Sequence, residues 1–253
     1  MMDYKLNSYL AEVCGIHAGD GYLRNDGKRR ELTIEGSFEE KEYYDKHVVP
    51  LFSRVFNIDI KNCKYHPLRG TYGFSIRDIK VIKFMHSLGF PYGKKSLIVR
   101  APCFVFENTK LVVPFLRGYF DTDGCLAFSN KPCIGYSEFK RVKHYYPSIL
   151  FSTVSFPLFL DVNLMLKYTH FKFFNCIYKS KKETESLRYR TVLSGVNEML
   201  TFLNIIGISN PVKSSRYLVW KKYGFCPTKT RYTQRLKMIE GSLNPEEFYK
   251  KGL

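Results

Sequence analysis

The sequence contains an internal repeat, and this repeat constrains the fold more than any other feature. Residues 13–21 and 116–124 carry a glycine, a small residue, an aspartate and a second glycine at matching places. The aspartates are Asp20 and Asp123, which are 103 residues apart. Self-similarity of this kind indicates that one structural unit is present twice in the chain.

A second spacing extends the repeat. Beyond the paired aspartates, the spacing between matching residues is 118, and it relates Ser37, Phe38, Phe84, Gly89, Lys95 and Ser96 to Ser155, Phe156, Phe202, Gly207, Lys213 and Ser214. The larger spacing predicts an insertion in the second copy, and residues 130–147, rich in lysine, arginine and tyrosine, are its expected place. We therefore expect one unit over residues 1–105 and a second over residues 106–253, which also carries a basic C-terminal extension.

Each copy predicts the element order αββαββα. Ser8 is the expected N-cap of a helix that runs to about Ala18, residues 37–40 form a capping box, and Asp78 is expected to open a helix that ends near Gly89. Strand-like segments joined by turns lie between these helices. The expected strands cover residues 22–24, 31–35, 58–66 and 72–76 in the first copy, and 125–129, 148–154, 171–179 and 187–193 in the second.

Composition and charge narrow the class of protein. The chain is 45% hydrophobic and 16% aromatic, which is too apolar for a disordered protein. The longest apolar stretch, residues 149–166, is interrupted by polar residues and proline, and the first ten residues lack the apolar run of a signal peptide, so we expect no membrane span and no secretion. Seven cysteines without Cys-x-x-Cys spacing favour a reducing compartment, the cytoplasm or an organellar matrix. A net charge of +17 predicts a polyanionic partner, most often nucleic acid, although a basic surface can also serve solubility alone.

Small residues follow one face of each predicted motif helix. Gly15 and Gly19 are four residues apart, as are Gly118 and Thr122, so each pair lies on one side of its helix. Small side chains at this spacing allow two helix backbones to approach closely. We therefore expect the two helices to pack against each other. The alternative is that the small residues only end two separate helices.

Asp20 and Asp123 are expected where a carboxylate is disfavoured. Each would end its helix, where the macrodipole is negative, and parallel packing would bring the two carboxylates together. Divalent cations such as Mg²⁺, which prefer oxygen ligands, would make this arrangement favourable. Carboxylates that bridge such ions can hold a scissile phosphate and activate a water molecule. Asp121 is instead predicted to cap a helix, because Ala18 occupies the matching place.

The two motifs resemble the paired signature of the LAGLIDADG homing endonucleases. Residues 116–124 read LRGYFDTDG and residues 18–21 read AGDG, although residues 17–18 depart from the signature. Residues 93–96 and 101–102 also resemble archaeal and intein-type members. The resemblance covers nearly the whole chain. It implies an α+β fold in which two pseudo-symmetric αββαββα repeats form a saddle of antiparallel sheets over double-stranded DNA.

The resemblance also implies an activity and a metal site. It implies a monomeric enzyme that cleaves both DNA strands at a long specific site, leaves 3′ overhangs and serves intron homing. The cofactor would be Mg²⁺, with Mn²⁺ able to substitute. By position, Asp20 and Asp123 match the metal-binding acids of the family, and Gly19 and Thr122 are the neighbouring candidates for the metal site.

A basic residue near each scissile phosphate is a further feature that the resemblance implies. Lys95 and Lys213 are the candidates, because they share the 118 spacing and follow the third helix of each copy. A lysine there could stabilise the charge on the phosphate during cleavage. Lys94 is a rival, and an ordinary solvated or phosphate-contacting lysine is the alternative.

Polar residues on the predicted strands could read DNA. Alternate side chains of a curved antiparallel sheet can face base edges in the major groove. The candidates in the first copy are Arg24, Asn25, Arg29, Arg30, Thr33, Lys64, Tyr65, Arg69, Tyr72 and Arg77. The candidates in the second copy are Ser129, Lys131, Lys179, Arg188 and Arg190. The basic C-terminal extension could grip the DNA backbone or form a charged surface.

Two other functions fit the same fold. An RNA maturase or a non-catalytic DNA-binding regulator could retain the architecture, but loss of the motif acids would be expected in such a protein, and both acids are present. Neither end of the sequence resembles the splicing residues of an intein, so we expect a free-standing or intron-encoded enzyme.

Overall fold

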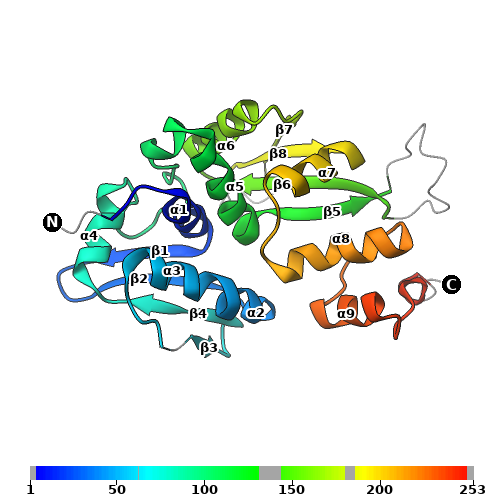
Figure 1. The fold of residues 1–253 in the computed structure, drawn as a ribbon, viewed down its shortest axis with the longest axis horizontal. Helices are drawn as coiled ribbons and strands as arrows, with labels where there is room; N and C mark the ends of the chain where they lie inside the picture. Colours follow the sequence, from blue (N-terminus) through cyan, green and yellow to red (C-terminus); the bar gives the residue numbers. More distant parts are fainter. Residues whose placement is uncertain (1–3, 62, 131–143, 180–185, 250–253) are drawn as a thin grey trace.

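Both predicted copies of the repeated unit are present in the structure (Figure 1). The computed structural model describes residues 4–61, 63–130, 144–179 and 186–249. The first copy consists of α1 (Ser8–Asp20), β1 (Gly21–Asn25), β2 (Arg30–Ser37), α2 (Lys41–Tyr43), α3 (Val49–Phe56), β3 (Lys64–His66), β4 (Thr71–Ile76) and α4 (Ile79–Ser87). The second consists of α5 (Thr109–Asp123), β5 (Cys125–Ser129), β6 (Tyr146–Thr153), α6 (Phe156–Tyr168), β7 (Phe174–Tyr178), β8 (Arg188–Ser194) and α7 (Val196–Ile205). The helices α8 (Pro211–Tyr223) and α9 (Tyr232–Glu240) follow.

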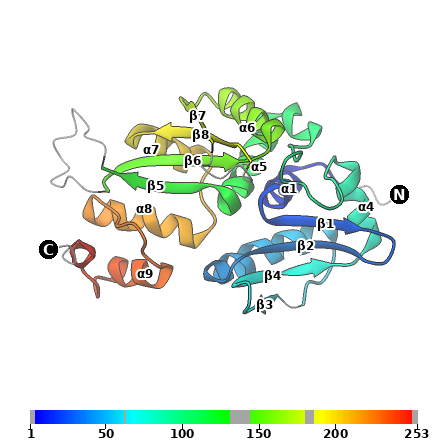
Figure 2. The ribbon, with the colours of Figure 1, turned by 180° about the vertical axis from the view of Figure 1, so that it is seen from behind.

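Each copy forms a four-stranded antiparallel sheet with the same strand order. The order is β1-β2-β4-β3 in the first copy and β5-β6-β8-β7 in the second, which confirms the predicted α+β repeat. Helices cover one face of each sheet. Figure 2 shows the strands of both sheets in front of these helices, so the two uncovered faces lie on the same side of the molecule. Together they form the predicted saddle.

Side-chain caps at matching places define the helix starts. Ser37 forms the predicted capping box, Ser155 caps α6 at the matching place in the second copy, and Asp78 caps α4 as predicted. The start of α1 differs from the prediction, because Asn7 and not Ser8 is its N-cap. Asn7 has the extended backbone that an N-cap needs, with φ −143°, whereas Ser8 is already helical.

One predicted strand is much shorter than expected. Of residues 58–66, only β3 pairs with β4. Asn57 ends α3 in a left-handed conformation, with φ 50°, and residues 58–61 follow without strand pairing. The alternating apolar residues Ile58 and Ile60 pack on the core instead of marking a strand.

The connection after β5 is the expected place of the insertion. Residues 26–29 join β1 to β2, whereas residues 130–145 join β5 to β6. Within this connection, residues 131–143 lie outside the described part of the chain. The second connection is 12 residues longer than the first, which accounts for most of the change of spacing from 103 to 118.

Helices α1 and α5 run in the same direction at the centre of the molecule, and their backbones touch. A Cβ atom on Gly15 would lie 2.1 Å from the carbonyl oxygen of Phe115, and one on Gly118 would lie 2.4 Å from that of Glu12. Glu12 and Phe115 are themselves 103 residues apart, so the contact obeys the pseudo-symmetry of the repeat. The small residues therefore do what their spacing predicts.

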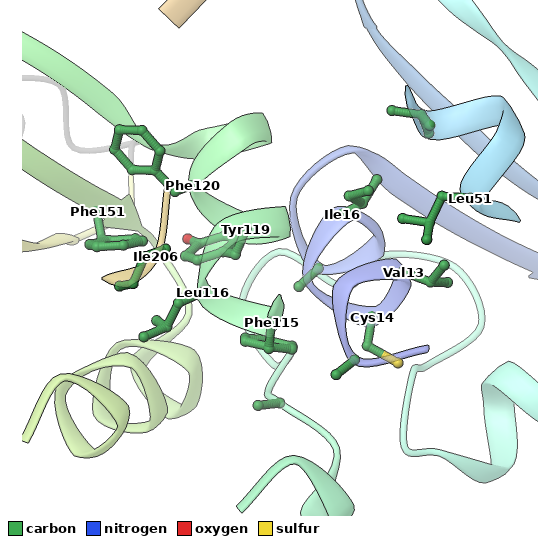
Figure 3. Close-up of a cluster of buried hydrophobic side chains, with 14 of the residues drawn as sticks. Val13, Cys14, Ile16, Leu51, Phe115, Leu116, Tyr119, Phe120, Phe151 and Ile206 are labelled. Atoms are coloured by element: carbon green, nitrogen blue, oxygen red, sulfur yellow. The ribbon is translucent and has the colours of Figure 1, made fainter. Parts of the chain in front are cut away.

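Apolar side chains fill the space on the outer sides of these two helices. Figure 3 shows Val13 of α1 on the side of Leu51 of α3, and Phe120 of α5 beside Phe151 of β6. The ring centroids of Phe120 and Phe151 are 5.6 Å apart, and all four side chains are buried. Each motif helix thus joins its own copy by hydrophobic packing and the other copy by backbone contact.

A buried ion pair also joins the two helices. The carboxylate of Glu12 in α1 accepts a hydrogen bond of 2.6 Å from the guanidinium of Arg117 in α5, and its other oxygen lies 2.7 Å from Nε2 of His47. Burial acts to raise the pKa of Glu12, but the hydrogen bonds from His47 and Arg117 outweigh it and lower the pKa. This ion pair fixes how α1 and α5 align along their length.

The C-terminal extension contacts both copies. Asn210, the N-cap of α8, donates hydrogen bonds of 2.6 Å to Oε1 of Glu40 and 2.8 Å to the carbonyl oxygen of Asp121. Tyr232, the first residue of α9, donates its hydroxyl to Glu42 at 3.0 Å. The extension therefore holds the two copies together.

Within the described ranges, no helix combines the length and the apolar character that crossing a membrane requires. The cysteines that the structure describes are all free.

Candidate metal centre and nucleic-acid interface

The two motif aspartates lie side by side where α1 and α5 end. Asp20 is the last residue of α1, and Asp123 is the last residue of α5. A Cβ atom on Gly19 would lie 2.1 Å from Oγ1 of Thr122 and 3.4 Å from Cγ of Asp123. The parallel helices therefore bring the two predicted metal-binding acids together at the junction of the two copies.

Asp20 is held by a tyrosine and surrounded by charged groups. The hydroxyl of Tyr44 donates a hydrogen bond of 2.8 Å to Oδ2 of Asp20. Burial, with the nearby carboxylates of Asp123 and Glu40, raises the pKa of Asp20 to about 7, while Tyr44 and the ammonium of Lys213 act in the opposite direction. A cation at this position would relieve the repulsion among these carboxylates.

Asp123 lies in a different setting. Its side chain is exposed at a groove of about 560 Å³ that is also lined by Gly19, Lys95, Ser152 and Arg188. The protein packed around the carboxyl displaces part of its water and raises the pKa of Asp123, while Lys95 and Lys213 act to lower it. The groove gives a ligand direct access to this acid.

The two candidate lysines occupy equivalent places under the motif helices. Nζ of Lys95 donates to the carbonyl oxygens of Ala18 and Gly19, the latter at 2.6 Å. Nζ of Lys213 donates to the carbonyl oxygens of Phe120, Thr122 and Gly124 at 2.7, 2.6 and 2.7 Å. Each lysine therefore neutralises the negative C-terminal end of the motif helix of its own copy.

The burial of these lysines affects their charge. Burial lowers the pKa of Lys95 to about 8 and also lowers the pKa of Lys213, although the neighbouring carboxylates act to raise both. The structure thus places both ammonium groups among helix carbonyls next to the acids. Lys94, the rival candidate, lines the groove beside Asp123.

The residues at this junction fit a hard divalent cation. Among the described residues, no group of three or more histidine, cysteine or acidic side chains is arranged to hold a metal ion. Mg²⁺ does not need such a cage, because it commonly binds through one or two carboxylates and keeps water or substrate phosphate as its other ligands. Asp20 and Asp123 supply two such carboxylates. The carbonyl oxygens of Gly19 and Thr122 already accept hydrogen bonds from Lys95 and Lys213, so they are less available as ligands for a cation.

Comparison with known proteins shows which fold the chain shares. A family model described as a LAGLIDADG-like domain matches residues 110–207, from α5 to the end of α7. The structure of the homing endonuclease I-DmoI in complex with DNA and Mn superposes with a TM-score of 0.52 and 14% sequence identity, over 79% of this chain and 96% of that chain. The chain has the fold of the LAGLIDADG homing endonucleases. Mesophilic variants of I-DmoI give the same TM-score and identity, over 79% of this chain and 88% of that chain.

Other relatives with this fold show that it is not confined to one kind of protein. Full-length DUF199/WhiA from Thermatoga maritima has a TM-score of 0.50 and 12% identity, over 93% of this chain and 66% of that chain. In sequence, the chain is 27% identical over 213 residues to a Replication factor C small subunit of Methanocaldococcus jannaschii. That alignment covers 84% of this chain and only 10% of the relative, so the chain spans about a tenth of that protein's length.

Three residues at the junction of the two copies, near Asp20 and Asp123, are not among the predicted site residues. Tyr44 donates a hydrogen bond to Asp20, and Glu40 lies near the same carboxylate. Asn210 donates a hydrogen bond to Glu40. The repeat could not reveal them, because the 118 spacing places Val162 opposite Tyr44 and Leu158 opposite Glu40. The capping box did point to Glu40, but only as a helix-capping residue.

Two motif residues are structural. Contrary to the prediction, Asp121 does not cap α5. Its buried carboxylate accepts the N–H of Ser209 at 2.9 Å, and so anchors the segment that leads into α8. His17 is fully buried, and its ring packs against Phe90 with centroids 4.4 Å apart, so it is a packed residue of the helix interior.

Most of the predicted DNA-reading residues of the first copy share one open surface. Strand alternation turns Leu32 and Ile34 of β2 toward the helices and Thr33 toward the open face. One hollow on that face is lined by Arg24, Arg29, Thr33, Lys64, Arg69 and Arg77, and Arg30 lies beside it. Asn25 pairs with Arg30 at the end of β1, outside this hollow.

Two predicted DNA-reading tyrosines are on the wrong side of the sheet. Tyr65 pairs with Tyr72 across β3 and β4, so both side chains point to the face that the helices cover. Tyr72 is buried and donates its hydroxyl to Asp45 at 2.7 Å, while Tyr65 packs against Phe38 with ring centroids 4.2 Å apart. Their alternation along the strands was misassigned because the sequence does not reveal the register.

The open face of the second sheet carries less charge. Ser129, Arg188 and Arg190 alternate with core residues as predicted, and the guanidinium of Arg190 lies 4.5 Å from the ring centroid of Tyr178. The residues that neighbour them on this face of β5, β6 and β8 are uncharged: Cys125, Ala127, Ser148, Leu150 and Val192. Lys179 follows β7 and is exposed, and Lys131 lies outside the described residues.

Proposed function

We propose that the chain is a site-specific DNA endonuclease that hydrolyses both strands of a long duplex target with the help of a divalent cation. The observation that carries the proposal is the meeting of Asp20 and Asp123 at the ends of two touching parallel helices. The open faces of both sheets lie on one side of the molecule, and the net charge of +17 favours a polyanion. The fold that the chain shares with the DNA complex of I-DmoI supports the same substrate class.

The residues at the junction have distinct tasks in this proposal. Asp20 and Asp123 would hold Mg²⁺ or Mn²⁺, which supplies charge stabilisation at the phosphate and lowers the pKa of a bound water. Lys95 and Lys213 hold the ends of α1 and α5, so that both carboxylates keep their positions when the duplex binds. Their positive charge beside the site would also stabilise the negative charge that develops on the phosphate during cleavage.

The finer features of the proposal follow from the resemblance to LAGLIDADG enzymes. The products would carry 3′ overhangs, the enzyme would act as a monomer in the cytoplasm or an organellar matrix, and the reaction would serve intron homing. Because both copies are in one chain, a single molecule can present two acids to the two strands.

The test is cleavage of a library of duplex targets. The purified protein would be incubated with randomised plasmid targets in the presence of Mg²⁺, Mn²⁺ or EDTA, and cut molecules would be sequenced. Cutting at one long sequence with either metal, and none with EDTA, is the expected result. Cleavage that persists in EDTA would contradict the metal-dependent mechanism.

A non-catalytic DNA-binding protein is the second candidate. The match of this chain to full-length DUF199/WhiA is close to its match to I-DmoI, so the fold alone does not require cleavage. Specific binding of duplex DNA without cutting under any metal condition would favour this candidate. Tight binding of structured RNA together with no cutting would favour a maturase.

The hollow on the first sheet is expected to bind DNA in a salt-dependent manner. Replacing the exposed Arg77 or Lys64 with alanine should weaken binding and reduce the slope of log affinity against log salt by about 1 for each phosphate that the side chain neutralises. The measurement is fluorescence anisotropy with labelled duplex at several salt concentrations. Lys46→Ala is the control, because Lys46 is exposed on the helical side of the molecule and pairs with Glu42 at 2.9 Å. An equal effect of Lys46→Ala would contradict the assignment of this face.

A further inference from the structure

The hydrogen bond between Tyr44 and Asp20 has no counterpart at the second motif. Tyr44 donates to Oδ2 of Asp20 at 2.8 Å. The residue at the 118 spacing is Val162, which cannot donate. In the described part of the chain, no side chain donates a hydrogen bond to the carboxylate of Asp123. The two acids match in sequence but differ in how they are held.

The backbone around Tyr44 is built to place its hydroxyl under Asp20. Residues Tyr44–Val48 form a π-helical turn between α2 and α3, and Pro50 follows it. Proline has no N–H to continue the ordinary helical ladder, which accounts for a wider turn just before it. Tyr44 is fully buried, and its ring packs edge-on against those of Tyr43 and Tyr72 at 6.0 and 6.2 Å. The hydroxyl therefore has a fixed position.

A glycine makes room for this hydrogen bond. A Cβ atom on Gly36 would lie 2.7 Å from the Tyr44 hydroxyl, 2.8 Å from Oδ2 of Asp20 and 3.1 Å from Oε2 of Glu40. Any side chain at Gly36 would push these three groups apart. Three elements, α1, β2 and the π-helical turn, thus converge to hold one oxygen of Asp20.

We propose that Tyr44 is a positioning residue for the first metal-binding acid. By binding Oδ2, it fixes the orientation of the Asp20 carboxylate and leaves Oδ1 for a cation. Asp123 lacks such a partner among the described side chains, so the two DNA strands are served by acids with different degrees of preorganisation. This inference rests on the proposed function, because it assigns Tyr44 a role within the same site.

The test compares Tyr44→Phe with Tyr43→Phe. Both substitutions remove one buried hydroxyl, but that of Tyr43 has no hydrogen-bond partner among the described residues. The first measurement is Mn²⁺ binding by electron paramagnetic resonance in the absence of DNA. Outer hydrogen-bond partners of metal ligands typically affect metal affinity by about 10–100-fold, so Tyr44→Phe should weaken binding at one site by about tenfold while Tyr43→Phe leaves it unchanged. Equal Mn²⁺ affinity in wild type and Tyr44→Phe would overturn the inference.

The second measurement resolves the two strands. With each strand of the target labelled separately, Tyr44→Phe should slow nicking of one strand by about 10–100-fold. The other strand should be cut at nearly the wild-type rate, so that nicked DNA accumulates. Equal slowing of both strands would overturn the positioning role. Failure of the wild-type protein to cut any DNA would overturn the proposed function instead, and the Mn²⁺ measurement would then decide about Tyr44 by itself.

A double-mutant cycle separates positioning from folding. In an Asp20→Asn background, Tyr44→Phe should cause no further loss of Mn²⁺ affinity, because the carboxylate that it orients is absent. A loss as large as in the wild-type background would show that Tyr44 acts through general stability, and would contradict the inference.

Discussion

Asp20→Asn and Asp123→Asn proteins are each expected to lose metal-dependent cleavage by more than about 100-fold while still binding DNA. The amide keeps the shape of the side chain but removes the negative charge that a hard cation requires. Even residues that only support metal ligands typically change activity by about 10–100-fold, and a direct ligand should exceed that range. Because the two acids come from the two copies, either substitution alone should prevent double-strand cleavage.

The affinity for DNA is expected to increase in both the Asp20→Asn and the Asp123→Asn protein. Two carboxylates at the phosphate backbone repel it when no cation is bound, so each Asp→Asn protein should bind the duplex more tightly than wild type in EDTA. Gel-shift titration in EDTA and plasmid cleavage in Mg²⁺ measure the two effects. Asp59→Asn is the matched control, because Asp59 is exposed and its carboxylate lies 3.7 Å from the ammonium of Lys61. Full cleavage by either the Asp20→Asn or the Asp123→Asn protein would contradict the assignment of that acid as a metal ligand.

The fold was largely predictable because the repeat imposes many constraints at once. Ser37 and Ser155, related by the 118 spacing, both cap helices, and Gly89 and Gly207 both have positive φ, at 103° and 76°. Glycine adopts such φ values without strain, which explains why the same residue recurs there. A single copy would have left the assignment of these short signals open.

Features without a repeat partner were not predictable. The short strand β3 follows from the left-handed Asn57 at the end of α3, and a pattern of apolar residues does not reveal that backbone conformation. The role of α8 was also hidden, because its basic composition suggested contacts with DNA. In the structure, Asn210 at the start of this helix donates hydrogen bonds to Glu40 of the first copy and to the carbonyl oxygen of Asp121 in α5.

The acids were predictable, but their surroundings were not. Asp20 and Asp123 stand at the ends of two helices whose contact face the small residues indicated. Tyr44 and Glu40 reach Asp20 from other elements of the first copy, so only the tertiary structure brings them together. Lys95 and Lys213 were identified by their shared spacing, yet their bonds to helix carbonyls depend on how each chain segment turns back toward its motif helix.

The close contact of α1 and α5 predicts an unusual sign for a glycine substitution. In an ordinary helix, Gly→Ala stabilises by about 1 kcal/mol, because alanine has the higher helix propensity. Gly15 lies in the interior of α1, but a Cβ atom there would come within 2.1 Å of the carbonyl oxygen of Phe115 and 2.8 Å of the backbone nitrogen of Tyr119. These atoms are backbone and cannot rotate away. Gly15→Ala is therefore expected to lower the free energy of unfolding by more than about 3 kcal/mol.

Chemical denaturation of Gly15→Ala and Gly27→Ala separates the steric clash with the backbone of α5 from other effects of adding a methyl group. Gly27 lies in the β1–β2 turn with φ 83° and nothing within 4 Å of an added Cβ, so Gly27→Ala should cost only about 1–2 kcal/mol through backbone strain. A gain of stability in Gly15→Ala would mean that the helices are not in backbone contact. Because Asp20 and Asp123 meet only where these helices touch, the substitution should also lower Mn²⁺ affinity in whatever fraction remains folded. Loss of stability with unchanged Mn²⁺ affinity would show that the acids do not depend on this contact.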